Sequence, residues 1–178
     1  YRQAGIWTIE RGSNPADGGS PYYTCYETRD GKYMATGAVE KRFYAEMVQK
    51  LGLDPASLPN RDDKACWPEL HDIFANEFKK KDRDEWARIF AEGDACVSPV
   101  LTMDEAPSDA TAKERGMFKS HRGITEPMPA PRFSRTPSDI RSAPVDPKQG
   151  THDALAAWGI DADKIRAMAD AGVIPPGK

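Results

Sequence analysis

One carboxylate stands out by its place in the sequence. Glu40 follows the small residues Thr36, Gly37 and Ala38, and it comes directly before the apolar periodicity of an amphipathic helix. A carboxylate so placed either begins a helix or is directed at a group that takes part in acid–base chemistry. From the residues alone the helix-start interpretation is favoured, because a helix N-terminus stabilises a nearby negative charge by about 0.3–1 kcal/mol.

The other residues that could do chemistry are three histidines and three cysteines. They are His71, His121, His152, Cys25, Cys66 and Cys96. No histidine has a partner at the spacing of a metal site or a catalytic triad, so we expect surface or capping roles for all three. The cysteines are odd in number and form no CxxC pair, which argues against a disulfide framework and a zinc site and fits a reducing cytoplasm.

Composition limits the classes of protein to which the chain can belong. Its 178 residues, 39% hydrophobic and 30% charged, suffice for one ordinary core or a small core with appendages. The net charge of −3 comes from interspersed acidic and basic residues, which excludes a basic nucleic-acid face and a polybasic membrane patch. No apolar run reaches the roughly 20 residues of a membrane helix, and the start has no signal-peptide pattern. We therefore expect a cytoplasmic protein with no nucleic-acid, membrane or metal partner. Because the first residue is not Met, we also expect a fragment or a processed product.

Two antiparallel strands are predicted before Glu40. The segments YYTCYET and YMATGA flank Asp30 and Gly31, which can both take positive φ at low cost and so favour a hairpin turn. A third strand-like run, ACVSPVLT, contains Pro99, which limits the strand to a sheet edge or a bend.

Three helices are predicted after Glu40. Apolar residues recur at three- and four-residue spacing in residues 43–51, 67–78 and 86–90. Gly52 stands where a C-cap glycine belongs, and Asp82 with Glu85 has the form of a capping box. Strands and helices together predict an α+β domain.

The two ends of the chain read differently from this domain. Residues 1–20 are rich in Gly, Asn, Asp and Pro and are interpreted as a linker or an extended arm. Regular signals fade again from Pro107 to about Gly150, where proline is frequent. Two short helices are predicted at the C-terminal end, closing at Gly159 and Gly172, and we expect them to dock on something else because they are too small to fold alone.

Four ordered blocks carry a resemblance. They are RGSNPADGGSPYYTCYETRDGKYMATGAVEKRFY, DACVSPVLTMDEAP, PAPRFSRTP and GTHDALAAWGIDADKIRAMADAGVI. Together they resemble the C-terminal half of the family III CoA-transferases, the CaiB/BaiF-like proteins. GAVE at residues 37–40 is similar to the Gly-Ala-Ile-Glu of the α-methylacyl-CoA racemases in that family, whereas the transferases more often carry a glycine-rich loop there.

The resemblance implies an architecture. Family members have a large Rossmann-like domain, a small α+β domain and a C-terminal segment that returns to the large domain, in an interlocked homodimer. On that template residues 1–20 resemble the outgoing linker, 21–108 the small domain, 109–145 an extended return linker and 146–178 the helical segment that docks on the large domain. The N-terminal half, with the catalytic histidine and aspartate, has no counterpart in this sequence.

The resemblance also implies a reaction. An isomerase of this type interconverts (R)- and (S)-2-methylacyl-CoA in lipid metabolism by removing the α-proton, forming an enolate and reprotonating it. Glu40 then corresponds to the glutamate that pairs with the catalytic histidine. Substrate-binding residues by the same resemblance are Tyr23, Gly37, Ala38, Val39 and Asp17. No cofactor is implied other than the coenzyme A of the thioester substrate.

Alternatives remain for each of these roles. Tyr23 is either part of the acyl-chain surface or a core residue, Asp17 either shapes a loop over the substrate or forms a plain turn, and Gly37 and Ala38 act by being small. Lys41 stands where many relatives have proline, and it could either loosen the loop or pair with Glu40 and lower the basicity of Glu40. The whole chain could instead be part of a CoA-transferase that moves CoA between carboxylic acids, or a non-catalytic fragment or interaction module.

Overall fold

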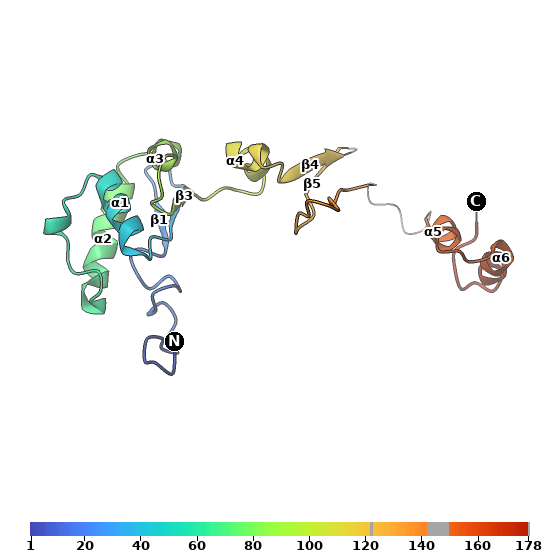
Figure 1. Cartoon of the computed structure of the whole chain (residues 1–178), viewed down its shortest axis with the longest axis horizontal. Coiled ribbons are helices and arrows are strands. Elements are labelled where there is room, and N and C mark those ends of the chain that lie inside the picture. Colours follow the sequence, from blue (N-terminus) through green and yellow to red (C-terminus); the bar gives the residue numbers. More distant parts are fainter. Residues whose placement is uncertain (122, 142–149, 178) are drawn as a thin grey trace. The chain divides into compact units, whose positions relative to one another are not determined.

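The chain divides into two compact units, Tyr1–Thr102 and Met103–Lys178, in a computed structural model (Figure 1). The structure describes residues 1–121, 123–141 and 150–177. Helices accompany two small antiparallel sheets, which confirms the predicted α+β class.

A three-stranded antiparallel sheet organises the first unit. Its strands are β1 (Cys25–Glu27), β2 (Tyr33–Thr36) and β3 (Val97–Pro99), in the order β1-β2-β3. Pro99 lies in the edge strand β3, as predicted. Successive side chains of a strand point to opposite faces of a sheet. The register places Tyr26, Met34 and Pro99 in one row across the strands and Cys25, Ala35 and Ser98 in the next.

The turn between β1 and β2 differs from the expectation in one detail. Only Gly31 takes a positive φ, 74°, whereas Asp30 does not. The N–H of Gly31 donates to the carbonyl of Thr28 at 3.0 Å, and the N–H of Thr28 donates to the carbonyl of Lys32 at 2.8 Å. This is the pattern of a three-residue hairpin loop that ends in a left-handed glycine. The Asp30 side chain is used elsewhere, because it accepts hydrogen bonds from the Thr28 hydroxyl and the Arg83 N–H.

The three predicted helices are present and end where their caps indicate. They are α1 (Lys41–Leu51), α2 (Trp67–Phe78) and α3 (Arg83–Phe90), with short 3-10 turns at Pro55–Ser57 and Lys64–Cys66. Gly52 closes α1 in the left-handed conformation with φ 76°. The capping box of Asp82 and Glu85 begins α3, with both reciprocal hydrogen bonds formed. These predictions are confirmed.

An aromatic cluster lies between the inner face of the sheet and the helices. Phe78 is fully buried, and its ring stacks on Tyr26 with 5.2 Å between centroids. Trp86 packs against Phe78 at 5.5 Å and donates its indole N–H to the Phe78 carbonyl. Met34 of β2 and Met47 of α1 complete this core, with 0% of either residue exposed. The sheet is therefore covered on one face by α1, α2 and α3.

The second unit contains more regular structure than the expected extended linker at residues 109–145. A 3-10 turn (Ala106–Ser108) precedes α4 (Ala110–Glu114), and β4 (Phe118–His121) pairs with β5 (Ile124–Pro127). Elements of four or five residues are too short to produce a periodic pattern, so the sequence gives no signal for them. The part of the expected linker at residues 142–149 lies outside the described residues.

The two predicted C-terminal helices are α5 (Thr151–Ala157) and α6 (Ala162–Asp170). Gly159 and Gly172 follow them with φ of 80° and 69°, and the Asp161 carboxylate caps α6 by accepting from the N–H of Asp163. Both closing glycines agree with the prediction.

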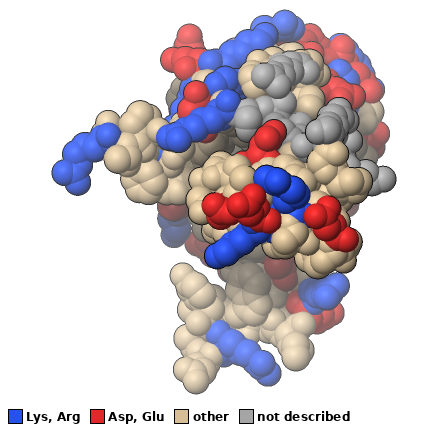
Figure 2. Space-filling model, turned by 90° about the vertical axis from the view of Figure 1, so that its right-hand side faces the viewer, with Lys and Arg blue, Asp and Glu red and all other residues tan. Residues whose placement is uncertain are grey.

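Acidic and basic side chains are interspersed on the face that Figure 2 displays, in keeping with the net charge of −3. Of the helices in residues 1–121, 123–141 and 150–177, none has the length and apolar character needed to cross a membrane.

The aromatic cluster leads to a stability prediction. Phe78→Ala removes a fully buried ring and leaves a cavity, so we expect a loss of about 3–5 kcal/mol in the free energy of unfolding. The control Tyr33→Ala removes an aromatic ring that is 46% exposed on β2, and it should lose less than about 1 kcal/mol. Urea unfolding followed by tryptophan fluorescence measures both. Equal losses for the two variants would contradict the assignment of the core.

Candidate functional site

Glu40 is the N-cap residue of α1, and its carboxylate does not cap the helix. Its backbone is extended, with φ −73° and ψ 144°, and its carbonyl accepts the N–H of Tyr44 at 3.0 Å. The side chain is exposed and forms no capping hydrogen bond. An N-cap side chain usually stabilises a helix by accepting one of its free N–H groups. This contribution is missing at Glu40, so the helix-start interpretation retains only the long-range attraction to the dipole.

Lys41 does not neutralise Glu40. Its ammonium group lies 3.3 Å from the carboxylate of Asp62, and the Lys41 side chain is 84% exposed. An exposed pair of this kind contributes little stability. The pairing of Lys41 with Glu40 considered from the sequence is therefore not the one that the structure contains.

Each backbone N–H of residues 37–39, the segment before Glu40, donates a hydrogen bond. The Gly37 N–H donates to the carbonyl of Cys96 at 2.8 Å, and the Ala38 N–H donates to the carbonyl of Tyr22 at 2.9 Å. The Val39 N–H donates to the carbonyl of Gly37 at 2.8 Å, which makes a tight turn centred on Ala38. Glu40 thus follows a well-fixed stretch of backbone that joins β2 to α1.

A groove of about 550 Å³ lies on the outer face of the sheet, opposite the core. It is lined by Gly18, Tyr23, Thr24, Cys25, Ala35, Thr36, Gly37, Cys96 and Ser98. Because alternate residues of each strand face this side, the row of Cys25, Ala35 and Ser98 forms its floor. These side chains are small, so the backbone of the sheet is accessible from the groove.

The structure brings some of the predicted site residues together and separates others. Tyr23 and Gly37 both line the groove, and Tyr23 is 40% exposed, which excludes the alternative that it is a core residue. Ala38 is fully buried, and Val39 is 37% exposed outside the groove lining. The sequence analysis missed Ser98 and the small-residue floor, because a row across strands becomes visible only once the register is known.

Cys96 marks the end of the groove that is near Glu40. Partial desolvation raises the pKa of the exposed Cys96 thiol, and the negative charges of Asp94 and Glu40 raise it further. A thiol with a raised pKa is a poor nucleophile at neutral pH. Cys96 is also the only non-glycine residue with positive φ, 52°, in the described part of the chain. Its role here is to accept the Gly37 hydrogen bond and to line the groove.

The loop at residues 12–20 is compact rather than an extended arm, because Asp17 organises it. The Asp17 carboxylate accepts from the N–H groups of Gly12, Asn14 and Gly19 at 2.9–3.1 Å and from the Asn14 amide at 2.7 Å. Burial opposes ionisation of Asp17, yet these hydrogen bonds outweigh it and hold the pKa of the carboxyl below its ordinary value. Asp17 therefore shapes the loop that carries Gly18 into the groove.

His71 fastens this loop to the core. One ring nitrogen lies 3.0 Å from the carbonyl of Gly19, and the other lies 3.2 Å from the hydroxyl of Tyr26. A hydrogen bond to Gly19 and one to Tyr26 replace the surface or capping role expected from the sequence. Gly19 allows the close packing here, since a Cβ at this position would lie 2.5 Å from the backbone of Gly12.

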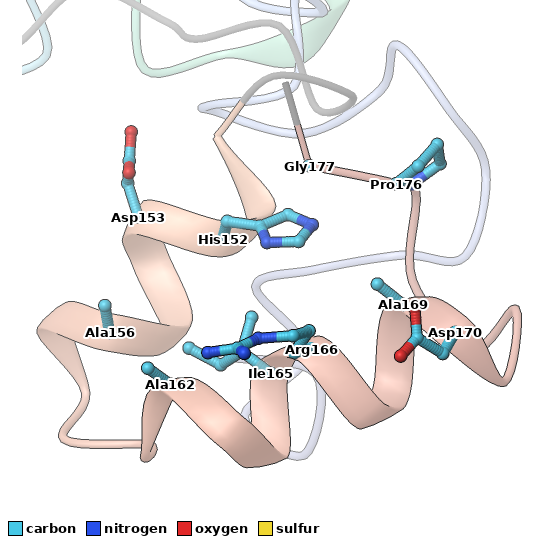
Figure 3. A pocket seen from close by; sticks show the side chains of 10 residues that line it. All are labelled: His152, Asp153, Ala156, Ala162, Ile165, Arg166, Ala169, Asp170, Pro176 and Gly177. Atoms are coloured by element: carbon cyan, nitrogen blue, oxygen red, sulfur yellow. The ribbon is translucent and has the colours of Figure 1, made fainter.

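A second hollow of about 580 Å³ lies between α5, α6 and the residues that follow α6. Figure 3 shows its side chains, among which the Asp153 side chain points away from the hollow. His152 donates one hydrogen bond from Nε2 to the Pro175 carbonyl at 2.8 Å, and Arg166 pairs with the exposed Asp163. Its polar groups do not converge on one point, so this hollow is the weaker candidate.

Comparison with known proteins identifies the family. The sequence matches the profile of the family described as CoA-transferase family III over residues 4–153. The chain belongs to CoA-transferase family III. This finding confirms the resemblance drawn from the four sequence blocks.

Two relatives of this family III chain are named alpha-methylacyl-CoA racemase. The protein of Mus musculus is 43% identical over 164 residues, which are 90% of this chain and 43% of the relative. The protein of Homo sapiens is 40% identical over 176 residues, which are 97% of this chain and 46% of the relative. The chain thus spans less than half of the length of either relative.

A solved structure of the same fold is that of a CaiB/BaiF family protein from Brucella suis. It superposes with a TM-score of 0.53 and 22% sequence identity, over 78% of this chain and 37% of that one. At this identity the likeness concerns the fold alone. No cluster of three or more His, Cys, Asp or Glu side chains in the described part of this family III chain could hold a metal ion.

Two glycines of the site allow a matched test of the loop geometry. A Cβ on Gly19 would overlap the Gly12 backbone at 2.5 Å, whereas one on Gly37 would lie 3.7 Å from the Cys96 carbonyl, an ordinary contact. We expect Gly19→Ala to lower the free energy of unfolding by about 1–3 kcal/mol, as overpacking does. Gly37→Ala should change it by less than about 1 kcal/mol. Thermal melts of the two variants give the comparison, and similar melting temperatures would contradict the close packing at Gly19.

Proposed function

We propose that this chain is the C-terminal part of a 2-methylacyl-CoA racemase and that Glu40 orients the catalytic histidine of that enzyme. The observation that carries the proposal is the free carboxylate of Glu40, which makes no hydrogen bond or ion pair with any described residue. The carboxylate follows a fixed segment beside an open groove. The racemase names of the two relatives support the choice of reaction within the family.

The reaction needs two acid–base groups, one on each face of the α-carbon. A base on one face takes the α-proton, and the electron pair of the C–H bond moves into the thioester to form an enolate. A proton donor on the opposite face then protonates the α-carbon, which inverts its configuration. We assign these roles to a histidine and an aspartate of the N-terminal half of the enzyme. His71, the histidine of the first unit, is engaged with Gly19 and Tyr26 and is not assigned either role.

Glu40 would act on the histidine rather than on the substrate. A carboxylate that accepts the N–H of an imidazole selects one tautomer, fixes the ring orientation and raises the basicity of the other nitrogen. The N-terminus of α1 adds unpaired N–H groups and the positive end of a helix dipole at the same place. These groups favour negative charge, such as that of an enolate oxygen.

The groove is the proposed surface for the acyl part of the thioester. Tyr23 offers an aromatic face to the acyl chain, and Gly37 lets the thioester approach the backbone closely. Ala38 and Val39 hold the turn between the groove and Glu40, and Asp17 holds the loop at Gly18. Coenzyme A enters only as part of the substrate, so the proposal includes no separate cofactor.

The proposed enzyme is an interlocked homodimer in the cytoplasm. α5 and α6 support the docking of the C-terminal segment on a large domain. Trp158 beside them is 88% exposed, while Ile165 is their one buried residue in the described part of these helices. Such a pair of helices buries too little apolar surface to be stable alone. A second candidate function is CoA transfer between carboxylic acids, which the description of the matching family favours.

The role of Glu40 can be tested in the complete natural enzyme. Glu40→Gln keeps the size of the side chain and removes the charge, so the basicity of the histidine should fall. We expect turnover to drop by about 10²–10⁴, the range of acid–base support. The loss in α-proton exchange should be larger for the enantiomer that the histidine deprotonates. Single-turnover deuterium exchange on each enantiomer, together with thermal melts, measures both effects.

Glu69→Gln is the matched control, because Glu69 is an exposed carboxylate in the first turn of α2. It should leave exchange unchanged. Normal exchange in the Glu40 variant with a lowered melting temperature would reduce Glu40 to a helix-start residue. Transfer of CoA to an added carboxylate without racemisation would favour the second candidate function.

This chain on its own is expected to have no racemase activity. In the proposal, both proton-transfer residues belong to the part of the enzyme that this chain does not span. Incubation of the 178-residue chain with an (R)-2-methylacyl-CoA in D₂O should give no α-deuterium above the buffer background. Mass spectrometry of the recovered thioester measures the exchange, and clear incorporation would show that the proposed division of roles is wrong.

A further inference from the structure

Arg61 occupies an unusual position for a cation. Its side chain is 12% exposed and lies in the connection between α1 and α2. The guanidinium carbon is 3.9 Å from the ring centroid of Tyr22 and 4.4 Å from that of Tyr44. The Arg61 carbonyl accepts the indole N–H of Trp67 at 2.9 Å. The residue is thus held at its backbone by one aromatic side chain and at its guanidinium by two others.

The guanidinium reaches the segment that precedes Glu40. One terminal nitrogen donates to the Val39 carbonyl at 2.6 Å, and the other donates to the Ala38 carbonyl at 3.3 Å. The N–H groups of Gly37, Ala38 and Val39 are already bound to other backbone carbonyls. Arg61 therefore binds two carbonyl groups of the same turn. Hydrogen bonds thus hold the segment through its N–H groups and through its carbonyl groups.

A buried cation needs compensation for the water that it loses. The acidic partner of Arg61 is Asp62, whose oxygen lies 3.5 Å from Nε and whose side chain is 55% exposed. Much of the compensation must come from the two carbonyls and the two ring faces. A planar guanidinium can stack flat on rings while its fixed fork donates to two carbonyls, whereas the ammonium group of lysine has neither the plane nor the fork.

We propose that Arg61 is a positioning residue that acts through Glu40. It holds residues 37–39 in one conformation and so fixes the point from which the Glu40 carboxylate extends. This inference rests on the proposed function, because the catalytic effect is transmitted by Glu40. Nothing in the sequence pattern points to Arg61, which lies 21 positions after Glu40 in an irregular segment.

The test uses the complete natural enzyme and two variants. Arg61→Lys keeps the charge but loses the planar fork, and Arg61→Ala leaves a space between the two tyrosine rings. In both variants we expect faster amide hydrogen exchange in peptides covering residues 37–44. We also expect α-proton exchange to be slower by about 10- to 100-fold, as for a small displacement of a catalytic group. Arg88→Lys, at an exposed arginine of α3, is the control and should change neither quantity.

Two further measurements separate positioning from a general structural role. Millimolar guanidinium should restore part of the activity of Arg61→Ala, while ammonium at the same concentration should not. In the double variant with Glu40→Gln, Arg61→Lys should slow α-proton exchange by less than about twofold beyond Glu40→Gln alone, because residues that act as a unit are not additive.

The inference is overturned by unchanged hydrogen exchange at residues 37–44 in both Arg61 variants, whatever happens to catalysis. It is also overturned by fully multiplicative losses in the double variant, since Arg61 would then act independently of Glu40. Failure of the proposed function is recognised separately, by normal α-proton exchange in Glu40→Gln with Arg61 intact. The hydrogen-exchange comparison still decides in that case whether Arg61 holds the segment.

Discussion

The first unit depends on the covering of its sheet on one face only. Tyr26 and Met34 point inward onto Phe78 and the other aromatic residues of the helices, and this core contains the largest of the fully buried side chains in the described residues. Because side chains alternate along a strand, the inward direction of these two residues places Cys25, Ala35 and Ser98 on the outer face. The groove is therefore a consequence of core packing rather than a separate feature.

The loops around the groove are held by hydrogen bonds from polar side chains. Asp17 gathers backbone N–H groups at residues 12–19, His71 links that loop to Tyr26, and Arg61 holds the turn at Ala38 and Val39. Irregular backbone has no ladder of its own hydrogen bonds, so side chains must satisfy it if it is to keep one conformation. Preorganised loops of this kind suit a site in which a carboxylate must stand at a defined point.

Membership in CoA-transferase family III gives these features a common interpretation. The chain corresponds to less than half of the length of its named relatives, and its candidate site is correspondingly one-sided. The groove is open, and the Glu40 carboxylate has no hydrogen-bond or ion-pair partner among the described residues. Our proposal, in which the reacting groups come from another domain, accounts for both the open groove and the unpaired carboxylate. The racemase reaction remains the proposal that uses both.

The sequence by itself determined the local elements, because their signals are local. Apolar spacing, Gly52 and the pair Asp82 and Glu85 predicted helices and caps that the structure contains. The hairpin was predicted correctly, although its turn uses positive φ only at Gly31. The four sequence blocks also sufficed to predict the family. Short elements such as α4 and the β4–β5 hairpin were not predicted, because segments of four or five residues are too short to show a hydrophobic period.

Only the tertiary structure decided the exposure and the contacts of the site residues. Tyr23 lines the groove from the bend that precedes β1, and Lys41 pairs with Asp62 rather than Glu40 because the chain returns there. The contact of Arg61 with Val39 joins residues 22 positions apart. Periodicity and caps report on neighbours within a few residues, whereas contacts at such separations depend on how the elements pack around one core.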